Sequence, residues 1–116
     1  MISPEDFRRI ARSFPRAIEK PHFERTSFRV DVPKGKIFAT MLMGGDSANL
    51  MISRDDQDLL CASEPDVFTP VPNKWGEKGA TKISLSTANE DTARSGLRLA
   101  WLAAAPETIR GECPKT

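Results

Sequence analysis

"RTSFRVDVPKGKIFATMLM", residues 25–43, contains the alternation that decides the fold. Positions 26, 28 and 30 alternate with the polar positions 25, 27 and 29, which is the period of a β-strand with one buried face. Pro33 and Gly35 predict a tight turn, and residues 36–43 follow as a second strand that is apolar on both faces. The segment therefore predicts a pair of antiparallel strands.

A helix is predicted ahead of these strands. Ser3 is the expected N-cap and Pro4 the first helical residue. Residues at helical spacing then form one apolar stripe, namely Phe7, Ile10, Ala11 and Phe14. Pro15 ends the helix, and the arginines of residues 8–12 are expected to face water.

The remaining chain adds strands and helices to this start. After the turn at 44–46, residues 48–53 predict a third strand and residues 54–63 a short helix capped by Ser53. The proline-rich stretch 64–74 predicts an extended connector, anchored by Val67 and Phe68. Ile83 and Leu85 mark a further strand. Thr87 and Glu90 resemble a capping box before a last helix with one buried stripe, formed by Ala93, Leu97, Ala100, Trp101 and Ala104.

This order of elements predicts an α+β two-layer sandwich, an antiparallel sheet packed by helices on one face. Residues 1–105 are expected to form a single domain and residues 106–116 a flexible tail. With 116 residues and no apolar run near the roughly 20 residues that span a bilayer, the chain is expected to be a cytoplasmic monomer without membrane contact.

The net charge of +1 is unevenly distributed along the chain. Residues 41–72 contain a single basic residue, Arg54, against six acidic ones, whereas the segments on either side carry an excess of lysine and arginine. Duplex-binding domains usually have a clearly basic balance, because affinity rises with each phosphate neutralised. The sequence therefore allows a local basic face and argues against strong nonspecific nucleic-acid binding.

Catalytic and metal-binding patterns are missing from the sequence. His22 is the one histidine, and no nucleophile–base pair can be named around it. Cys61 and Cys113 lack metal-ligand spacing, and the acids at 55, 56 and 58 fall where a helix start already accounts for them. We expect no catalytic residue, no metal and no cofactor, and a protein that is not an enzyme.

A family resemblance joins several of these segments. "PHFERTSFRV", "GKIFAT" and "LLCASEPDVFTPVPNKWGEKGATKISL" resemble the MmcQ/YjbR family of small bacterial proteins, in order along nearly the whole chain. The resemblance implies a CyaY-like (frataxin-like) α+β fold and the label "DNA-binding", which rests on a likeness to double-wing domains. Ala80 departs from the family pattern, which usually has an aromatic residue there. The first helix and strand carry too many arginines for an iron-binding acidic ridge.

Two sets of candidate residues follow. In the first hypothesis, DNA is contacted by cations expected to share one face: Arg25, Arg29, Lys34, Lys36, Lys74, Lys78 and Lys82. In the alternative, the protein is an adaptor for a protein or a small anionic ligand, with a pocket near His22, Arg29 and Trp75. Trp75 lies within "NKWGEKGATKISL", residues 73–85, and has two interpretations. In the DNA hypothesis it stacks on an exposed base, and in the favoured interpretation it is an aromatic plug buried against the sheet, with Gly76 and Gly79 present for backbone reasons.

Overall fold

The alternation at residues 25–30 becomes one strand of a six-stranded antiparallel sheet in a computed structural model that describes residues 1–114. The strand order is β1-β2-β3-β4-β6-β5. The strands are β1 (Ala17–His22), β2 (Arg25–Val30), β3 (Ile37–Leu42), β4 (Ser47–Met51), β5 (Phe68–Pro70) and β6 (Ala80–Ser84). The prediction of an α+β sandwich with an antiparallel sheet is confirmed.

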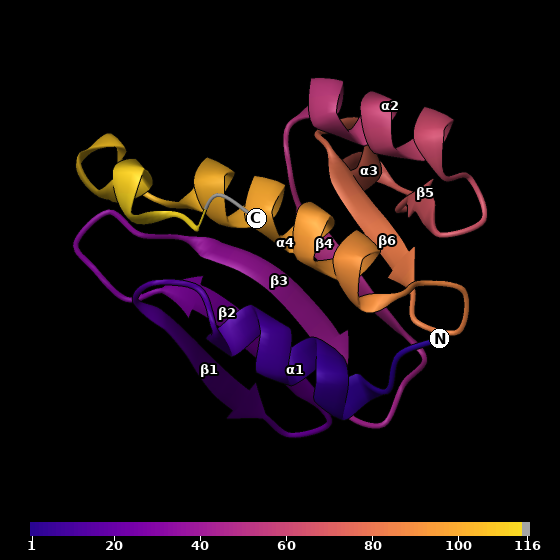
Figure 1. Cartoon of the computed structure of the whole chain (residues 1–116), viewed down its shortest axis with the longest axis horizontal. Coiled ribbons are helices and arrows are strands. Elements are labelled where there is room, and N and C mark those ends of the chain that lie inside the picture. Colours follow the sequence, from indigo (N-terminus) through magenta and orange to yellow (C-terminus); the bar gives the residue numbers. More distant parts are fainter. Residues whose placement is uncertain (115–116) are drawn as a thin grey trace.

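Helices α1 (Pro4–Arg12) and α4 (Glu90–Ala104) cover one face of this sheet, in front of it as Figure 1 is drawn. Phe28 of β2 is fully buried on the covered face, with its ring 6.0 Å from that of Phe7 and 6.4 Å from that of Phe38. Trp101 of α4 is fully buried, and its Nε1 donates to the Pro15 carbonyl at 2.8 Å. The hydrophobic core therefore sits between these two helices and the sheet.

The other helices lie toward the β5 end of the sheet. Helix α2 (Arg54–Ser63) packs beside β5 and β6, and α3 (Lys74–Glu77) is a four-residue helix between these two strands in sequence. The buried Gln57 of α2 donates through Nε2 to the carbonyls of Gly76 and Ala80, both at 2.9 Å. These hydrogen bonds hold α3 against α2.

Several local predictions are confirmed. Ser3 and Ser53 cap α1 and α2, each accepting a hydrogen bond from a backbone N–H three residues ahead. The predicted apolar stripes of α1 and α4 are buried, and so are Val67 and Phe68 in the connector. Burial also alternates along β2 as the sequence predicts.

Other predictions were wrong or incomplete. Strand β1 went unrecognised because "AIEKPH" lacks apolar alternation and contains a proline, which an edge strand tolerates. The connector contains β5 and α3. The N-cap of α4 is Asn89, whose side chain accepts from the Thr92 N–H, so the Thr87–Glu90 capping box does not form. A 3₁₀ helix, η1 (Glu107–Glu112), occupies most of the expected tail, whose last two residues lie outside the described chain.

Candidate functional site

The face of the sheet opposite α1 and α4 is not covered by either helix, and its strand residues carry no acid. The pairing register alternates side chains between the two faces and assigns the open face its residues strand by strand. These residues are Ile18, Lys20, His22, Arg25, Ser27, Arg29, Ile37, Thr40, Leu42, Ser47, Asn49, Met51, Ala80, Lys82, Ser84 and Thr69. Among these strand positions, all of them described, every charged side chain is basic.

Three of the sequence-predicted cations, Arg25, Arg29 and Lys82, share this open face. Arg25 extends toward β3, where its Nη2 lies 3.4 Å from the Thr40 hydroxyl. Arg25 and Lys82 are separated by β3 and β4 and by two residues along the strands, because Lys82 is in register with Ser27, which puts them roughly 16 Å apart. They therefore lie on either side of the two central strands.

On the covered side, Arg8 and Arg9 of α1 donate hydrogen bonds to carboxylates. Arg8 Nε donates to Glu19 Oε2 at 3.0 Å, and Arg9 Nη2 donates to Glu90 Oε1 at 2.7 Å. These hydrogen bonds raise the pKa of both arginines and lower the pKa of Glu90. Within residues 1–114, ion pairs form at the arginines 8, 9, 12, 16, 54 and 94 and at none of the open-face cations.

Two adjacent hollows with shared lining residues lie on the open face. The larger measures about 440 Å³ and has Trp75 as its wall, with Ile37, Met51 and Ala80 among its apolar lining. The smaller measures about 280 Å³ and is lined by Arg25 and Lys82, with the acidic Asp46 at its β3–β4 turn end. Both are lined by the polar side chains of Thr40 and Asn49 and by Val71. Together they form a groove with an aromatic end and a cationic end.

The prediction that Trp75 is a buried plug was wrong, because its side chain is 65% exposed. The two glycines beside it do serve the backbone, as predicted. A Cβ on Gly76 would lie 1.7 Å from the Val71 carbonyl oxygen, and Gly79 has a φ of +119° with a similar approach to Ile52. The glycines and the Gln57 hydrogen bonds fix the loop, and the loop presents Trp75 to solvent.

The other predicted cations lie around the edge of this face. Lys34 and Lys36 are in the β2–β3 turn, whose backbone is tied to the end of α4 by a hydrogen bond from the Lys36 N–H to the Ala104 carbonyl at 3.2 Å. Lys74 and Lys78 are carried by α3 and its C-cap, and Lys78 Nζ lies 5.9 Å from the centre of the Trp75 ring. Strand positions thus account for three of the seven candidates, and turns or α3 for the other four.

The three residues of the alternative pocket are not brought together. His22 pairs with Arg25 at one end of the β1–β2 hairpin, whereas Arg29 lies four residues farther along β2, roughly 13 Å away. Arg29 pairs with Ile37, which lines the hollow beside Trp75. The ring of His22 instead stacks edge-on against Phe23, with centroids 4.5 Å apart. A ligand beside Trp75 can therefore reach the Arg29 end of the sheet more readily than His22.

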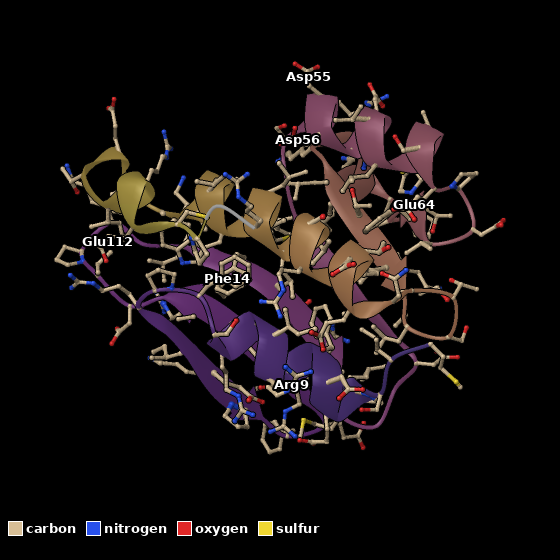
Figure 2. All side chains as sticks on the ribbon, viewed as in Figure 1. Arg9, Phe14, Asp55, Asp56, Glu64 and Glu112 are labelled. Atoms are coloured by element: carbon tan, nitrogen blue, oxygen red, sulfur yellow. The ribbon has the colours of Figure 1, made fainter. Side chains whose placement is uncertain are left out.

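Groups with chemical reactivity lie elsewhere. Burial raises the pKa of the half-buried Cys61 and Cys113 thiols, so neither is activated as a thiolate. In residues 1–114, no three His, Cys, Asp or Glu side chains are grouped as metal ligands. Figure 2 shows Asp55 and Asp56 at the start of α2.

No helix of the described chain has both the length and the apolar character needed to cross a membrane.

Sequence reasoning missed Lys20 and the polar floor of the groove. Lys20 pairs with Ser27 on the open face, and it was overlooked together with strand β1. Thr40 and Asn49 are paired across β3 and β4, but nothing in their sequence context separates them from ordinary strand residues. The pairing register of β3 with β4 was the missing information.

Comparison with known proteins agrees with this fold. The YjbR family model matches residues 12–103. The crystal structure of the Deinococcus radiodurans protein DR2400, with a DUF419 domain, superposes with a TM-score of 0.73 at 21% identity, covering 100% of this chain and 92% of that chain. No match was found among curated proteins. Because the family model spans more than half of the chain, the protein belongs to the YjbR family.

Proposed function

We propose that the protein is a binding module without catalytic activity, and that it binds nucleic acid, DNA first among the candidates, on the open face of the sheet. One observation carries this proposal: the cations of this face form no ion pair among the described residues, whereas four arginines of the covering helices α1 and α4 do, namely Arg8, Arg9, Arg12 and Arg94. An unpaired cation keeps its charge available for a phosphate. The resemblance to a family labelled DNA-binding points the same way.

The size of the cationic face sets the expected strength. Lys20, Arg25, Arg29 and Lys82 supply the strand charges, and the lysines of the β2–β3 turn and α3 border them. Asp46 and the near-neutral whole chain oppose accumulation of a polyanion. We therefore expect binding that is measurable at low salt and weakens as salt rises.

The test is fluorescence polarisation with labelled oligonucleotides at several salt concentrations. The double variant Arg25→Gln/Lys82→Gln should weaken binding and reduce the slope of log affinity against log salt by about 1.4 to 1.8. The matched control Arg9→Gln/Arg12→Gln removes the same charge from α1 and should retain the slope. Absence of wild-type binding to duplex and single-stranded oligonucleotides at low salt would refute the proposal.

A second candidate function is binding of a small anionic ligand in the larger hollow. Its volume of about 440 Å³ lies within the roughly 300–1,000 Å³ of small-molecule sites, and it combines an aromatic wall with the side chains of Thr40 and Asn49. A small ligand engaging one cation would show a shallow salt dependence, whereas a polymer touching several cations shows a steep one. The same salt titration therefore separates the two candidates.

A further inference from the structure

The groove on the open face has an apolar, aromatic end and a cationic end. The paired bases of a duplex are not available to the aromatic end, whereas its phosphates are available to the cationic end. The larger hollow is apolar and walled by an exposed indole, and the smaller hollow is flanked by cations. A paired and stacked base is shielded inside a duplex, whereas an unpaired base has a free π-face and a free hydrogen-bonding edge. The larger hollow therefore suits an unpaired base and the smaller one a phosphate.

Trp75 is held in place without being buried. The Asn73 side chain accepts from the Trp75 N–H at 2.8 Å, and the next residue's carbonyl accepts from Gln57 at 2.9 Å. The side chain lines two separate hollows, the larger one on the sheet and another of about 290 Å³ that it shares with Lys78. The backbone that carries the ring is therefore held in place, and the ring, 65% exposed, has a free surface on which a base can stack.

The floor of the larger hollow supplies hydrogen-bonding groups next to this ring. Asn49 and Thr40 face each other across β4 and β3, and both line the two hollows. An amide and a hydroxyl can donate to or accept from a base edge. Arg25 lies 3.4 Å from the same Thr40 hydroxyl, so a cation adjoins the point where the hollows meet.

We propose that the nucleic acid bound here is a single strand, with one base stacked on Trp75 in the larger hollow and its backbone running past Arg25 and Lys82. This inference rests on the proposed nucleic-acid binding and names the form of its ligand. Aromatic stacking tolerates any base, so the strand is recognised with little sequence preference.

The experiment compares a single-stranded oligonucleotide with the duplex of the same sequence, using polarisation and intrinsic fluorescence. Trp75 and Trp101 are the two tryptophans, and Trp101 is fully buried, so quenching by added oligonucleotide reports on Trp75. The single strand should bind more tightly than the duplex and quench the emission, and a strand of abasic sites should bind without quenching. Trp75→Ala should weaken single-strand binding by about 5- to 150-fold, and Trp75→Phe should restore part of it.

The outcomes distinguish a failure of the single-strand stacking site from a failure of nucleic-acid binding itself. If single strand and duplex bind equally, or Trp75→Ala leaves single-strand binding unchanged while Arg25→Gln/Lys82→Gln weakens it, the stacking site is wrong and nucleic-acid binding stands. If a mononucleotide binds as tightly as the oligonucleotide, the ligand is a small molecule and the inference fails. If no nucleic acid binds at low salt, both fail.

Discussion

On the covered side of the sheet, Arg8 is hydrogen-bonded to Glu5 and Glu19, whereas on the open side Arg25 reaches the hydroxyl of Thr40. Both arginines belong to one small domain, and their settings differ because the carboxylates of α1 and β1 that Arg8 contacts lie on the covered side. Figure 2 shows Arg9, which pairs with Glu90, on α1 in the same helical layer. Paired charges hold elements together, while unpaired cations leave a charge that a partner can use.

The apolar residues differ between the faces in the same way. Phe28 and Trp101 are fully buried on the covered side. Ile37 and Leu42 on the open side of β3 are 42% and 48% exposed. The apolar side chains of β3 are thus packed on the covered side and partly in water on the open side. The covered face holds the core on which the fold depends, and the open face is the one to which we assign the proposed binding. Substitutions at adjacent strand positions can test this division.

The largest expected effect comes from adjacent residues of β2. Phe28→Ala removes a ring packed between two others and should lower the free energy of unfolding by about 3–5 kcal/mol. Arg29→Ala, one residue along and on the open face, should change it by less than about 0.5 kcal/mol. Urea denaturation measures both. A loss above about 2 kcal/mol for Arg29→Ala would show that the open face also supports the fold.

A second pair lies on β1. The Glu19 side chain is 7% exposed and accepts from Arg8 Nε at 3.0 Å and from the Thr26 hydroxyl at 2.7 Å. Glu19→Ala leaves these donors without their acceptor and should lower the free energy of unfolding by about 1.5–3 kcal/mol. The neighbouring Lys20→Ala should leave stability nearly unchanged and weaken oligonucleotide binding. Equal destabilisation by the two substitutions would contradict the division between faces.

The sequence predicted the fold well because alternation and caps are local signals. The buried stripe of α4 and the alternation of β2 follow directly from residue spacing. Strand β1 was not predicted because this edge strand contains a proline and lacks the alternation of apolar and polar residues. The capping box at Thr87 failed because its hydroxyl donates instead to the Asp66 carbonyl at 2.7 Å, a tertiary contact that spacing does not show.

The candidate site was less predictable than the fold. The sequence predicted one shared face for all seven cations, whereas the order and register of the strands, with β6 next to β4, assign only Arg25, Arg29 and Lys82 to strand positions on the open face. Trp75 was expected to be buried because aromatic residues usually are, and its glycine loop fitted that expectation. The Gln57 side chain instead donates to the carbonyls of Gly76 and Ala80 and holds the loop in place, so the loop does not depend on burial of the Trp75 ring. Exposure of a single side chain depends on such contacts between distant residues.

Acid should weaken the covered side more than the open side. The hydrogen bond from Arg9 lowers the pKa of Glu90 below its ordinary value of 4.5, so the stability that the pair contributes is present above that value and lost as pH falls through the lowered pKa. Glu90→Gln should therefore show a smaller fall in Tm between pH 6 and pH 3 than the wild type. Glu77→Gln removes an exposed carboxylate of α3 that has no ion pair in the described chain, and should behave as the wild type does. A wild-type-like acid loss in Glu90→Gln would mean that this ion pair contributes nothing.

The smallest expected effect concerns Phe23, at the tip of the hairpin where both faces end. Phe23 is 90% exposed and has a φ of +58°, a left-handed conformation that costs a bulky residue about 1–2 kcal/mol and that glycine adopts freely. Phe23→Gly relieves this strain but loses the edge-on contact with His22 and adds freedom to the unfolded chain. These effects nearly cancel, so the free energy of unfolding should change by less than about 0.5 kcal/mol in urea denaturation. A loss above about 1 kcal/mol would show that the exposed ring supports the fold, and a gain above about 1 kcal/mol would show that the backbone strain outweighs the contact with His22.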